Sequence, residues 1–393
     1  MKKRGIKDIE VQDKTVLVRA DFNVPLDGNQ NITDDSRIQA TLPTIKYLLG
    51  QNSRVVAMSH MGRPKGKVVE ELRLNPVARR LSEILQIPVV KTVDCIGPEV
   101  KKAVAQLPAG GLLLLENVRF HPEEKKNDET FSRELAALGE IFVLDAFGSA
   151  HRAHASVAGV PRFLPAAAGM LLEKEIEYFS MLTQEPQRPY VAIVGGAKVK
   201  DKIGVLANLI NKVDSILIGG AMAYTFLQVQ GIPIGDSRME EESAGLAKDI
   251  LEKAAAQNIT FELPMDHICG DKFAPDTPFK ICREIAAGQL GLDIGPETVA
   301  KYKNIIMQAK TVIWNGPMGV FEWENFSNGT LGVATAMSEF DGVSVVGGGD
   351  SVAALKEFGL EDEISHVSTG GGASLEFLEG RTLPGIAALP DQE

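Results

Sequence analysis

Short apolar runs rich in β-branched residues alternate along the chain with stretches whose apolar positions recur at helical spacing. The clearest runs are Val16–Val18, Arg54–Met58, Leu112–Leu115, Ile141–Leu144, Val191–Val194, Ser215–Ile218, Thr311–Trp314 and Val343–Val346. Strands that are buried on both faces of a sheet have this composition, and helices connect one parallel strand to the next. The pattern therefore predicts an α/β protein with parallel sheets covered by helices.

Two of the predicted helices have recognisable ends. Asp35 or Ser36 can cap a helix that runs through Leu49 and stops at Gly50. Pro296 stands where the first residue of another helix would be, because a helix does not need an N–H group at that position.

The pattern is interrupted near the middle of the chain. Residues 171–182 have a helical pattern, residues 183–189 form a predicted loop, and a strand then starts afresh. We expect one domain over residues 1–170, a connecting helix and linker over 171–185, and a second domain over 186–376. A chain of 393 residues is long for a single hydrophobic core, which agrees with two domains.

Composition excludes some classes of function. Apolar residues make up 44% and charged residues 24%, as in ordinary globular proteins, and no apolar run approaches the ~20 residues of a membrane helix. A formal net charge of −11 argues against general affinity for nucleic acid, so any anion site must be a local cationic patch. The basic start of the chain lacks the apolar stretch of a secretory signal, and we expect a cytoplasmic protein.

The three cysteines point to the same compartment. Cys95, Cys269 and Cys282 are odd in number, far apart and without a CxxC pair. We therefore expect neither a disulfide nor a thiolate zinc site, in keeping with a reducing cytosol.

Cationic side chains stand at the ends of four predicted strands of the first half. They are Arg19, His60 with Arg63, Arg119, and the group His151, Arg152 and His154. Ligands of open parallel sheets lie beyond the carboxyl ends of the strands, and arginine binds carboxylate and phosphate with a planar fork of donors. Any single arginine could be a solvated surface charge, but the set predicts a site for a small, multiply anionic molecule.

Other residues of this region have less specific interpretations. Asp21 and Asn23 could orient the arginines or accept a hydrogen bond from a substrate hydroxyl. A metal site at His151 and His154 is less favoured than a structural role, since no carboxylate partner is evident.

Three apolar runs of the second half end in glycine clusters, and a helical pattern follows each one. The clusters are Gly195-Gly196, Gly347-Gly-Gly349 and Gly370-Gly-Gly372. Glycine allows an anion to approach backbone N–H groups, and a helix that starts there adds the positive end of its dipole. Each cluster alone could be a tight turn or a flexible loop. Three in one domain predict a surface that holds a polyphosphate.

Charged residues on the first two clusters strengthen this interpretation. Lys198, Lys200 and Lys202 follow the first cluster and can attract phosphates. Asp350 follows the second cluster and could hold Mg²⁺ that bridges phosphates, while Ser351 would cap the next helix. An exposed βα turn and a helix cap without a ligand are the structural alternatives.

Two further stretches are compatible with a nucleotide. The turn that starts at Asn315 leads to Glu322, which could accept hydrogen bonds from ribose hydroxyls. The small residues Gly219–Ala223 could support a flat base. Both signals are weak alone. The common nucleotide motifs GxxxxGK[ST] and GxGxxG and the protein-kinase motifs are missing from the sequence.

Together these segments resemble the phosphoglycerate kinase family over essentially the whole chain. The matching motifs follow in order: Arg19–Pro25, Ser59–Pro64, Glu116–Phe120, Asp145–His154, Gly195–Lys202, Asn315–Glu322, Gly347–Ser351 and Ser368–Gly372. Ser149, where the family usually has Thr, is a small departure. The resemblance implies reversible phosphoryl transfer between ATP and 3-phosphoglycerate, giving ADP and 1,3-bisphosphoglycerate, with Mg²⁺.

The resemblance also assigns residues. It implies that 3-phosphoglycerate is bound by Arg19, Asp21, Asn23, Arg37, His60, Arg63, Arg119 and Arg152. It implies that the nucleotide is bound by Lys198, Lys202, Gly219, Asn315, Glu322, Gly348, Gly349, Asp350 and Ser351, with Asp350 toward the metal. It further implies a monomer of two Rossmann-like lobes, whose tail, residues 377–393, returns to complete the first domain.

The chemistry needs no general base, because the attacking carboxylate or diphosphate oxygen is already anionic. We therefore expect alignment and charge stabilisation by Arg37, Lys202, Gly371 and Gly372, with His60 as a substrate-site residue. Reactant sites on different lobes imply closure about the connector at 171–185. A nicotinamide-dependent dehydrogenase and a non-catalytic anion-binding protein are the alternatives. The absence of GxGxxG counts against a dehydrogenase. The predicted polyphosphate surface of the second lobe counts against a non-catalytic anion-binding protein.

Overall fold

The computed structural model describes residues 2–392, which divide into two compact units. Unit 1 comprises the chain up to Glu177 together with the segment from Thr382 onward, and unit 2 comprises Tyr178–Arg381. Helix α6 (Met170–Gln184) passes from the first unit into the second.

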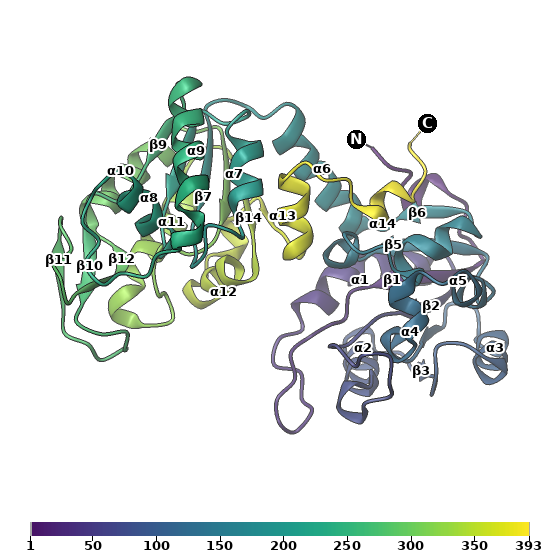
Figure 1. The fold of residues 1–393 in the computed structure, drawn as a ribbon. Coiled ribbons are helices and arrows are strands. Elements are labelled where there is room, and N and C mark those ends of the chain that lie inside the picture. Colours follow the sequence, from purple (N-terminus) through teal and green to yellow (C-terminus); the bar gives the residue numbers. More distant parts are fainter. Residues whose placement is uncertain (1, 393) are drawn as a thin grey trace. The chain divides into compact units, whose positions relative to one another are not determined.

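Unit 1 is built on a six-stranded sheet in which every strand pairing is parallel (Figure 1). Its order is β3-β4-β2-β1-β5-β6, with β1 (Thr15–Ala20), β2 (Arg54–Met58), β3 (Val89–Lys91), β4 (Leu112–Leu114), β5 (Ile141–Asp145) and β6 (Ala166–Ala168). Val16 and Val18 pack in the same core cluster as Ile38 and Leu42, while the alternate residue Leu17 is equally buried. Successive side chains of a strand point to opposite faces, so both faces of this sheet are covered.

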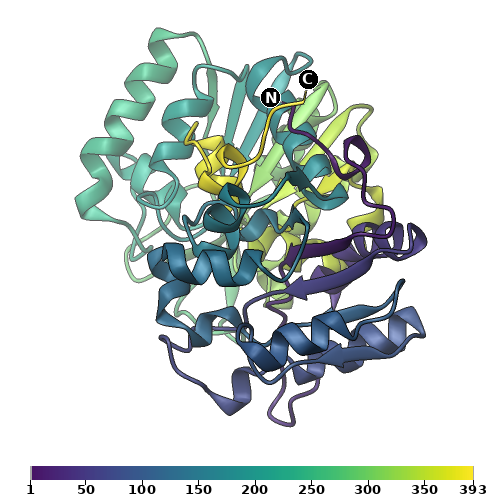
Figure 2. The same ribbon diagram turned by 90° about the vertical axis from the view of Figure 1, so that its right-hand side faces the viewer.

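The helices of unit 1 connect these strands. They are α1 (Ser36–Gly50), α2 (Asn75–Leu85), α3 (Pro98–Ala105), α4 (Pro122–Lys126) and α5 (Glu129–Ala136). Helix α1 begins after Asp35, as predicted, although the Asp35 side chain makes no capping hydrogen bond. The segment with α14 (Pro384–Ala387) lies beside the start of the chain, where Arg4 N donates to Pro390 O at 3.0 Å (Figures 1 and 2).

Unit 2 repeats the same architecture with a second six-stranded parallel sheet. Its order is β15-β14-β13-β7-β8-β9, with β7 (Tyr190–Val194), β8 (Ser215–Ile218), β9 (Thr260–Glu262), β13 (Thr311–Asn315), β14 (Val343–Gly347) and β15 (His366–Val367). Its helices are α7 (Ile203–Leu209), α8 (Met222–Val229), α9 (Ala244–Ala256), α10 (Pro296–Ile306), α11 (Asn328–Glu339), α12 (Gly349–Phe358) and α13 (Gly372–Leu378). Pro296 is the first residue of α10, as predicted. The predicted α/β fold class is confirmed in both units.

A small antiparallel sheet in unit 2 was not predicted. It has the order β11-β10-β12, formed by β10 (His267–Gly270), β11 (Phe279–Cys282) and β12 (Leu290–Ile294). Cys269 and Cys282 form a disulfide between neighbouring strands, with their Cα atoms 6.5 Å apart. The prediction of no disulfide was therefore wrong, because a hairpin can bring together cysteines that no short spacing motif connects.

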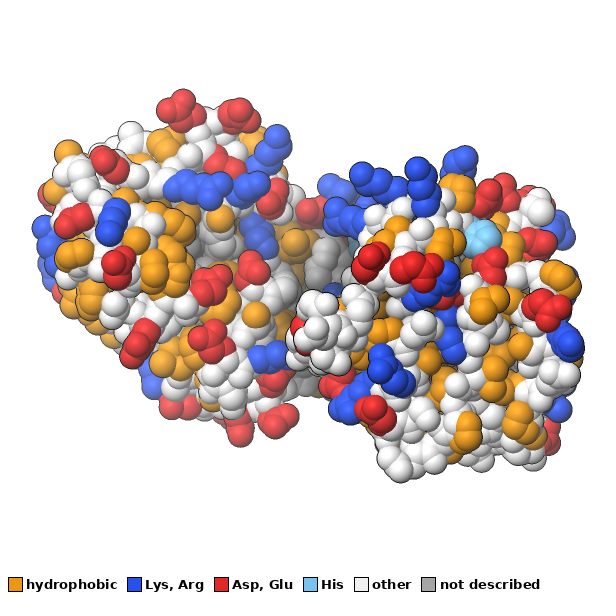
Figure 3. Space-filling view, turned by 90° about the horizontal axis from the view of Figure 1, so that it is seen from below, with side chains coloured by type: hydrophobic (Ala, Val, Ile, Leu, Met, Phe, Trp, Pro, Cys, Tyr) orange, Lys and Arg blue, Asp and Glu red, His pale blue; other side chains and the backbone are white. Residues whose placement is uncertain are grey.

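The surface is mixed in charge. Figure 3 shows acidic and basic side chains interspersed over the visible surface of both units. Between residues 2 and 392, none of the helices has the length and apolar character needed to cross a membrane.

Candidate active site

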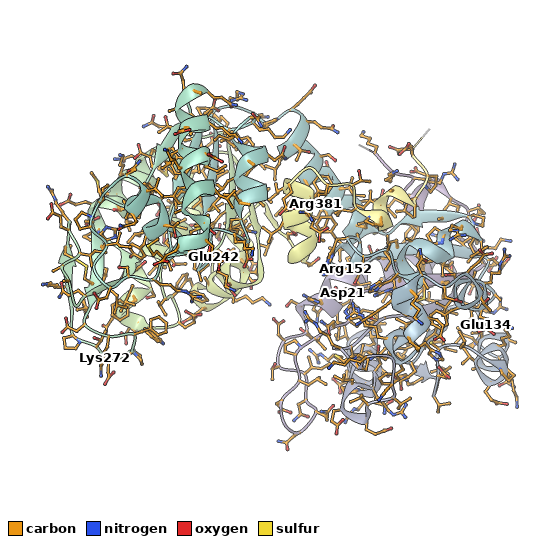
Figure 4. All side chains as sticks on the ribbon, viewed as in Figure 1. Asp21, Glu134, Arg152, Glu242, Lys272 and Arg381 are labelled. Atoms are coloured by element: carbon orange, nitrogen blue, oxygen red, sulfur yellow. A yellow bond between two sulfur atoms is a disulfide. The ribbon has the colours of Figure 1, made fainter. Side chains whose placement is uncertain are left out.

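The predicted cationic residues of unit 1 lie at or after the carboxyl ends of β1, β2, β4 and β5, which are neighbours in the sheet. Asp21 comes directly after β1, and Arg152 lies in the turn after β5. Figure 4 shows both of them at the same end of this sheet. The parallel topology thus assembles side chains that are up to 133 positions apart in the sequence, from Arg19 to Arg152.

Arg19 lies beneath this surface, because its side chain has no exposed area. Its guanidinium donates through Nε to Ser156 Oγ at 2.9 Å, and its Nη2 lies 3.1 Å from His60 Nδ1 and 3.4 Å from Ser149 Oγ. It also donates to the carbonyl of Ala20. Burial lowers the pKa of Arg19, while Glu124 and then Asp21 counteract that effect.

Asp21 and Asn23 organise the loop after β1. Arg37, from the first turn of α1, donates to the Asp21 carboxylate at 3.2 and 3.3 Å. Asn23 Oδ1 accepts from the backbone N–H of Gly62 at 2.8 Å and so fixes the neighbouring loop after β2. Although burial opposes ionisation, the positive charges around it lower the pKa of Asp21. The carboxylate therefore stays charged among the arginines.

The other three arginines of this region differ in burial and in hydrogen bonding. Arg119 Nη1 donates to Gly62 O at 2.9 Å, while its buried Nε has no partner among residues 2–392. Burial and the nearby Arg19 lower the pKa of Arg119 to about 10, which leaves it protonated at neutral pH. Arg63 and Arg152 are exposed.

His60 is neutral in this setting. Burial lowers its pKa well below the ordinary value, and Arg19, Arg119 and Arg37 add to that effect against the attraction of Asp21. The cluster therefore offers fixed guanidinium charge and a neutral imidazole, a combination suited to an anionic ligand.

In unit 2, glycines let the loops after β7, β8 and β13 interlock. Gly195 N donates to Asn315 O at 2.9 Å, and Gly196 N donates to Pro317 O at 3.0 Å. A Cβ atom on Gly316 would lie 2.1 Å from Gly195 O. The first glycine cluster thus allows close packing of backbone. The prediction that its N–H groups bind phosphate was wrong for Gly195 and Gly196, because both groups donate to backbone carbonyls.

Lys202 stands at the start of α7 and donates from Nζ to Asn315 Oδ1. Burial lowers its pKa to about 8, against the attraction of Asp350 and Asp201. Asn315 is itself buried, and its Nδ2 donor has no partner among residues 2–392. The end of β13 therefore presents a cation and a free amide donor side by side.

A pocket of about 490 Å³ opens beside these loops. Its walls are largely apolar and include Tyr224, Phe273, Leu290, Leu292 and Val320. The backbones of Gly220, Ala221 and Gly319 line it as well, and the carboxylates of Glu322 and Asp350 stand at its surface. An apolar slot next to a few polar groups has the form of a site for a flat organic ring that carries charged substituents.

The second glycine cluster begins α12. Gly348 precedes the helix with φ +91°, and Asp350 is exposed in the first turn. Ser351 was predicted to cap this helix, and that prediction was wrong, because Ser351 lies within the helix. Its buried Oγ instead accepts from Gly316 N at 2.6 Å and holds the loop after β13.

The third cluster begins α13. Gly370 N donates to Ser368 Oγ at 3.1 Å and is buried, so it is not a free donor. Gly371 precedes α13 with φ +52° and ψ −115°, and Gly372 is the first, exposed residue of that helix. Such a backbone, without side chains, leaves room for an anion at the helix start.

The sequence is similar to known proteins over its whole length. The family model for phosphoglycerate kinase matches residues 6–381. Phosphoglycerate kinase of Moorella thermoacetica is 54% identical over 394 residues and that of Roseiflexus sp. is 55% identical over 395, with the whole of each protein covered. The structure of phosphoglycerate kinase from Coxiella burnetii superposes with a TM-score of 0.89 at 42% identity, covering 98% of both chains.

The chain belongs to the phosphoglycerate kinase family. It is thus a kinase, a transferase of glycolysis, and the family substrates are ATP or ADP and 3-phosphoglycerate. The resemblance inferred from eight motifs is confirmed.

In unit 1 the structure places Arg19 beside His60 and Arg37 beside Asp21, and in unit 2 it places Glu322 and Asp350 on one pocket. Gly219, which was predicted to contact the nucleotide, does not line the pocket. It lies against Met318, and its neighbour Gly220 lines the pocket instead. The sequence did not predict that Tyr224, Phe273 and Leu292 line this pocket. Isolated apolar residues carry no spacing signal for base binding, and Phe273 is distinguished only in the structure, as a phenylalanine that is 68% accessible.

Proposed function

We propose that this chain transfers a phosphoryl group reversibly between ATP and 3-phosphoglycerate, with the sugar acid bound in unit 1 and the nucleotide in unit 2. The pocket of about 490 Å³, with apolar walls that end at Asp350 and Glu322, carries the proposal. It offers a slot for a base and charged groups for ribose and phosphates, while the arginine cluster of unit 1 offers the charge that a small phosphorylated acid needs.

In unit 1, Arg37, Arg63, Arg119 and Arg152 bind the carboxylate and phosphate of 3-phosphoglycerate. Asp21 and Asn23 hold the loops and accept from the substrate hydroxyl, and neutral His60 donates a hydrogen bond. Support comes from the two exposed arginines and the pairing of Arg37 with Asp21 at 3.2 Å. Because Arg19 is completely buried, we assign it a role beneath the substrate.

In unit 2, the base lies between the apolar walls and Glu322 accepts from the ribose. Lys198, Lys202, Asn315 and the turn at 348–351 then serve the phosphates. Mg²⁺ fits here because Asp350 presents an exposed carboxylate on the pocket wall, and Mg²⁺ is bound by one or two carboxylates together with phosphates and water. When bound, the ion neutralises charge on the phosphates.

The reaction needs no base. In the direction of ATP consumption, a carboxylate oxygen of 3-phosphoglycerate forms a bond to the γ-phosphorus while the bond to the ADP oxygen breaks. Arg37, Lys202 and the N–H groups of Gly371 and Gly372 stabilise the transferring group. Because the reactants occupy different units, direct transfer requires closure, for which residues 171–185, which are most of helix α6 and the residue after it, provide the hinge. The proposed enzyme is a monomer located in the cytoplasm.

The test is ATP consumption with 3-phosphoglycerate and Mg²⁺, coupled to NADH oxidation by glyceraldehyde-3-phosphate dehydrogenase. We expect Arg37→Ala or Lys202→Ala to lower kcat by roughly a hundredfold or more, the usual cost of a lost transition-state donor. Glu134→Gln, at a helix position of unit 1 away from the arginine cluster, is the matched control. Near-normal kcat in either folded variant would contradict the assignment.

A further inference from the structure

A buried carboxylate lies beneath the basic site of unit 1. Glu124, in α4, has no exposed side-chain area. Its two oxygens accept from the backbone N–H of Ser156 at 2.9 Å and from Ser156 Oγ at 2.6 Å. His154 Nδ1 lies 3.7 Å from Glu124, but burial lowers the pKa of His154 to about 4, so this contact is not an ion pair at neutral pH.

The Ser156 hydroxyl connects this carboxylate to Arg19. Arg19 Nε donates to Ser156 Oγ at 2.9 Å, so that oxygen accepts from the guanidinium. A hydroxyl has a single proton, and the carboxylate can only accept, so the hydroxyl donates its proton to Glu124. Glu124 is also the strongest of the negative charges that counter the burial of Arg19. The position of the guanidinium thus depends in part on a residue outside the substrate cluster.

Arg19 in turn determines which nitrogen of His60 carries the proton. Its Nη2 lies 3.1 Å from His60 Nδ1. A guanidinium has donors only, so Nδ1 must accept, and a neutral imidazole then carries its hydrogen on Nε2. That nitrogen, which Arg19 does not contact, becomes a hydrogen-bond donor for an anionic oxygen.

We propose that Glu124 is a positioning residue for the substrate site of unit 1, acting through Ser156 and Arg19 to hold His60 as the Nε2–H tautomer. The inference rests on the proposed function only in naming 3-phosphoglycerate as the ligand. The chain of contacts runs from an acceptor-only carboxylate to a donor-only guanidinium, and this direction leaves the imidazole a single arrangement.

The test uses Glu124→Gln and the smaller change Ser156→Ala in the full chain. The first change would present an amide donor to Ser156, and the second would remove the bridging hydroxyl. We expect either change to raise the KM for 3-phosphoglycerate about tenfold, the scale of one hydrogen bond to a charged group, with the KM for ATP unchanged. The two changes act on one chain of contacts, so the double variant should be little worse than either single variant.

The imidazole ¹⁵N and ¹H shifts of His60 give a readout that general loosening of the fold does not mimic. We expect the Nε2–H tautomer in the unaltered protein and a mixture with the Nδ1–H tautomer in both variants. The control is Glu129→Gln, on the exposed side of the adjacent helix, where Glu129 pairs with Arg133. It should change neither quantity.

An unchanged tautomer together with an unchanged KM in folded variants would overturn the proposal, as would a parallel rise in the KM of both reactants. If the unaltered protein transferred no phosphoryl group, the proposed function would fail. The His60 signals would still decide whether Glu124 controls the imidazole.

Discussion

At the scale of single residues, burial shifts the pKa values of charged groups in both units, and neighbouring charges decide how far each shift goes. Burial lowers the pKa of Lys202 to about 8, while Asp350 and Asp201 keep it from falling further. His60 is kept uncharged, and Arg119 stays protonated although burial lowers its pKa to about 10. The sites therefore combine cations of fixed charge with one that responds to pH.

Lys202 provides a pH test. With a pKa of about 8 it is protonated below that pH and neutral above it, so its attraction for phosphate is lost as the pH rises. We expect kcat/KM for ATP, measured at saturating 3-phosphoglycerate, to fall as the pH rises through about 8. Lys202→Arg should remove this fall, whatever its absolute rate, because an arginine stays protonated. The same decline in both proteins would show that another group titrates.

The sequence predicted which charged residues meet, because parallel topology brings strand ends together. It did not predict which of these side chains are buried and which are exposed. Arg19 and Arg152 occupy equivalent positions in the sequence pattern, yet one is fully buried and the other exposed. Burial of a side chain depends on tertiary neighbours such as Ser156 and Glu124, which carry no sequence signal for this role.

At the scale of elements, the loops after β7, β8 and β13 depend on glycine for packing. We expect Gly316→Ala to destabilise unit 2 by more than about 2 kcal/mol, the cost of overpacking and backbone strain, since its φ is +99° and a Cβ would meet Gly195 O. Urea unfolding measures the effect. Gly245→Ala is the control: it lies in α9 with open space around it, and it should stabilise by up to about 1 kcal/mol.

Helix α6 begins on a buried acid. Asp145, at the end of β5, accepts from the backbone N–H of Leu172 at 3.1 Å, and Thr44 Oγ1 accepts from Met170 N at 2.9 Å. Burial raises the pKa of Asp145 to about 7, although its hydrogen bonds to Thr44 and to the helix act in the opposite direction. The acid is therefore half ionised near neutral pH at the start of the proposed hinge.

This predicts a pH-dependent stability. Between about pH 4 and 7 the folded state holds a proton on Asp145 that the unfolded chain has lost, so its contribution is present at low pH and disappears as the pH rises. Relative to Asp145→Asn, the unaltered protein should lose up to about 1.4 kcal/mol of unfolding free energy per pH unit in that window. Parallel stability curves for the two proteins would contradict the raised pKa.

The central strands of both sheets were predictable because each is a continuous buried apolar run. Several of the missed strands are short or exposed. Strands β3, β6 and β9 have three residues each, and three of the four residues of β11 are exposed. Pairing with a neighbouring strand, rather than local composition, makes these segments extended.

At the scale of the whole molecule, the proposed function gives each unit half of the reaction. The arginine cluster of unit 1 has the charge for 3-phosphoglycerate, and the pocket of unit 2 has the walls and carboxylates for a nucleotide. An acyl phosphate is lost to water unless the transfer is shielded, and we propose that binding both reactants favours closure of the two units.

Small-angle X-ray scattering tests this coupling. We expect the radius of gyration to fall when 3-phosphoglycerate and the non-hydrolysable ATP analogue AMP-PNP with Mg²⁺ are bound together, and to fall less with either alone, because only the pair makes contacts across both half-sites. Lys202→Ala should weaken the response to the pair, since it removes a cation from the transferring group. A radius of gyration that does not change in the doubly bound state would contradict closure. The site assignments within each unit would then have to be reconciled with transfer through another route.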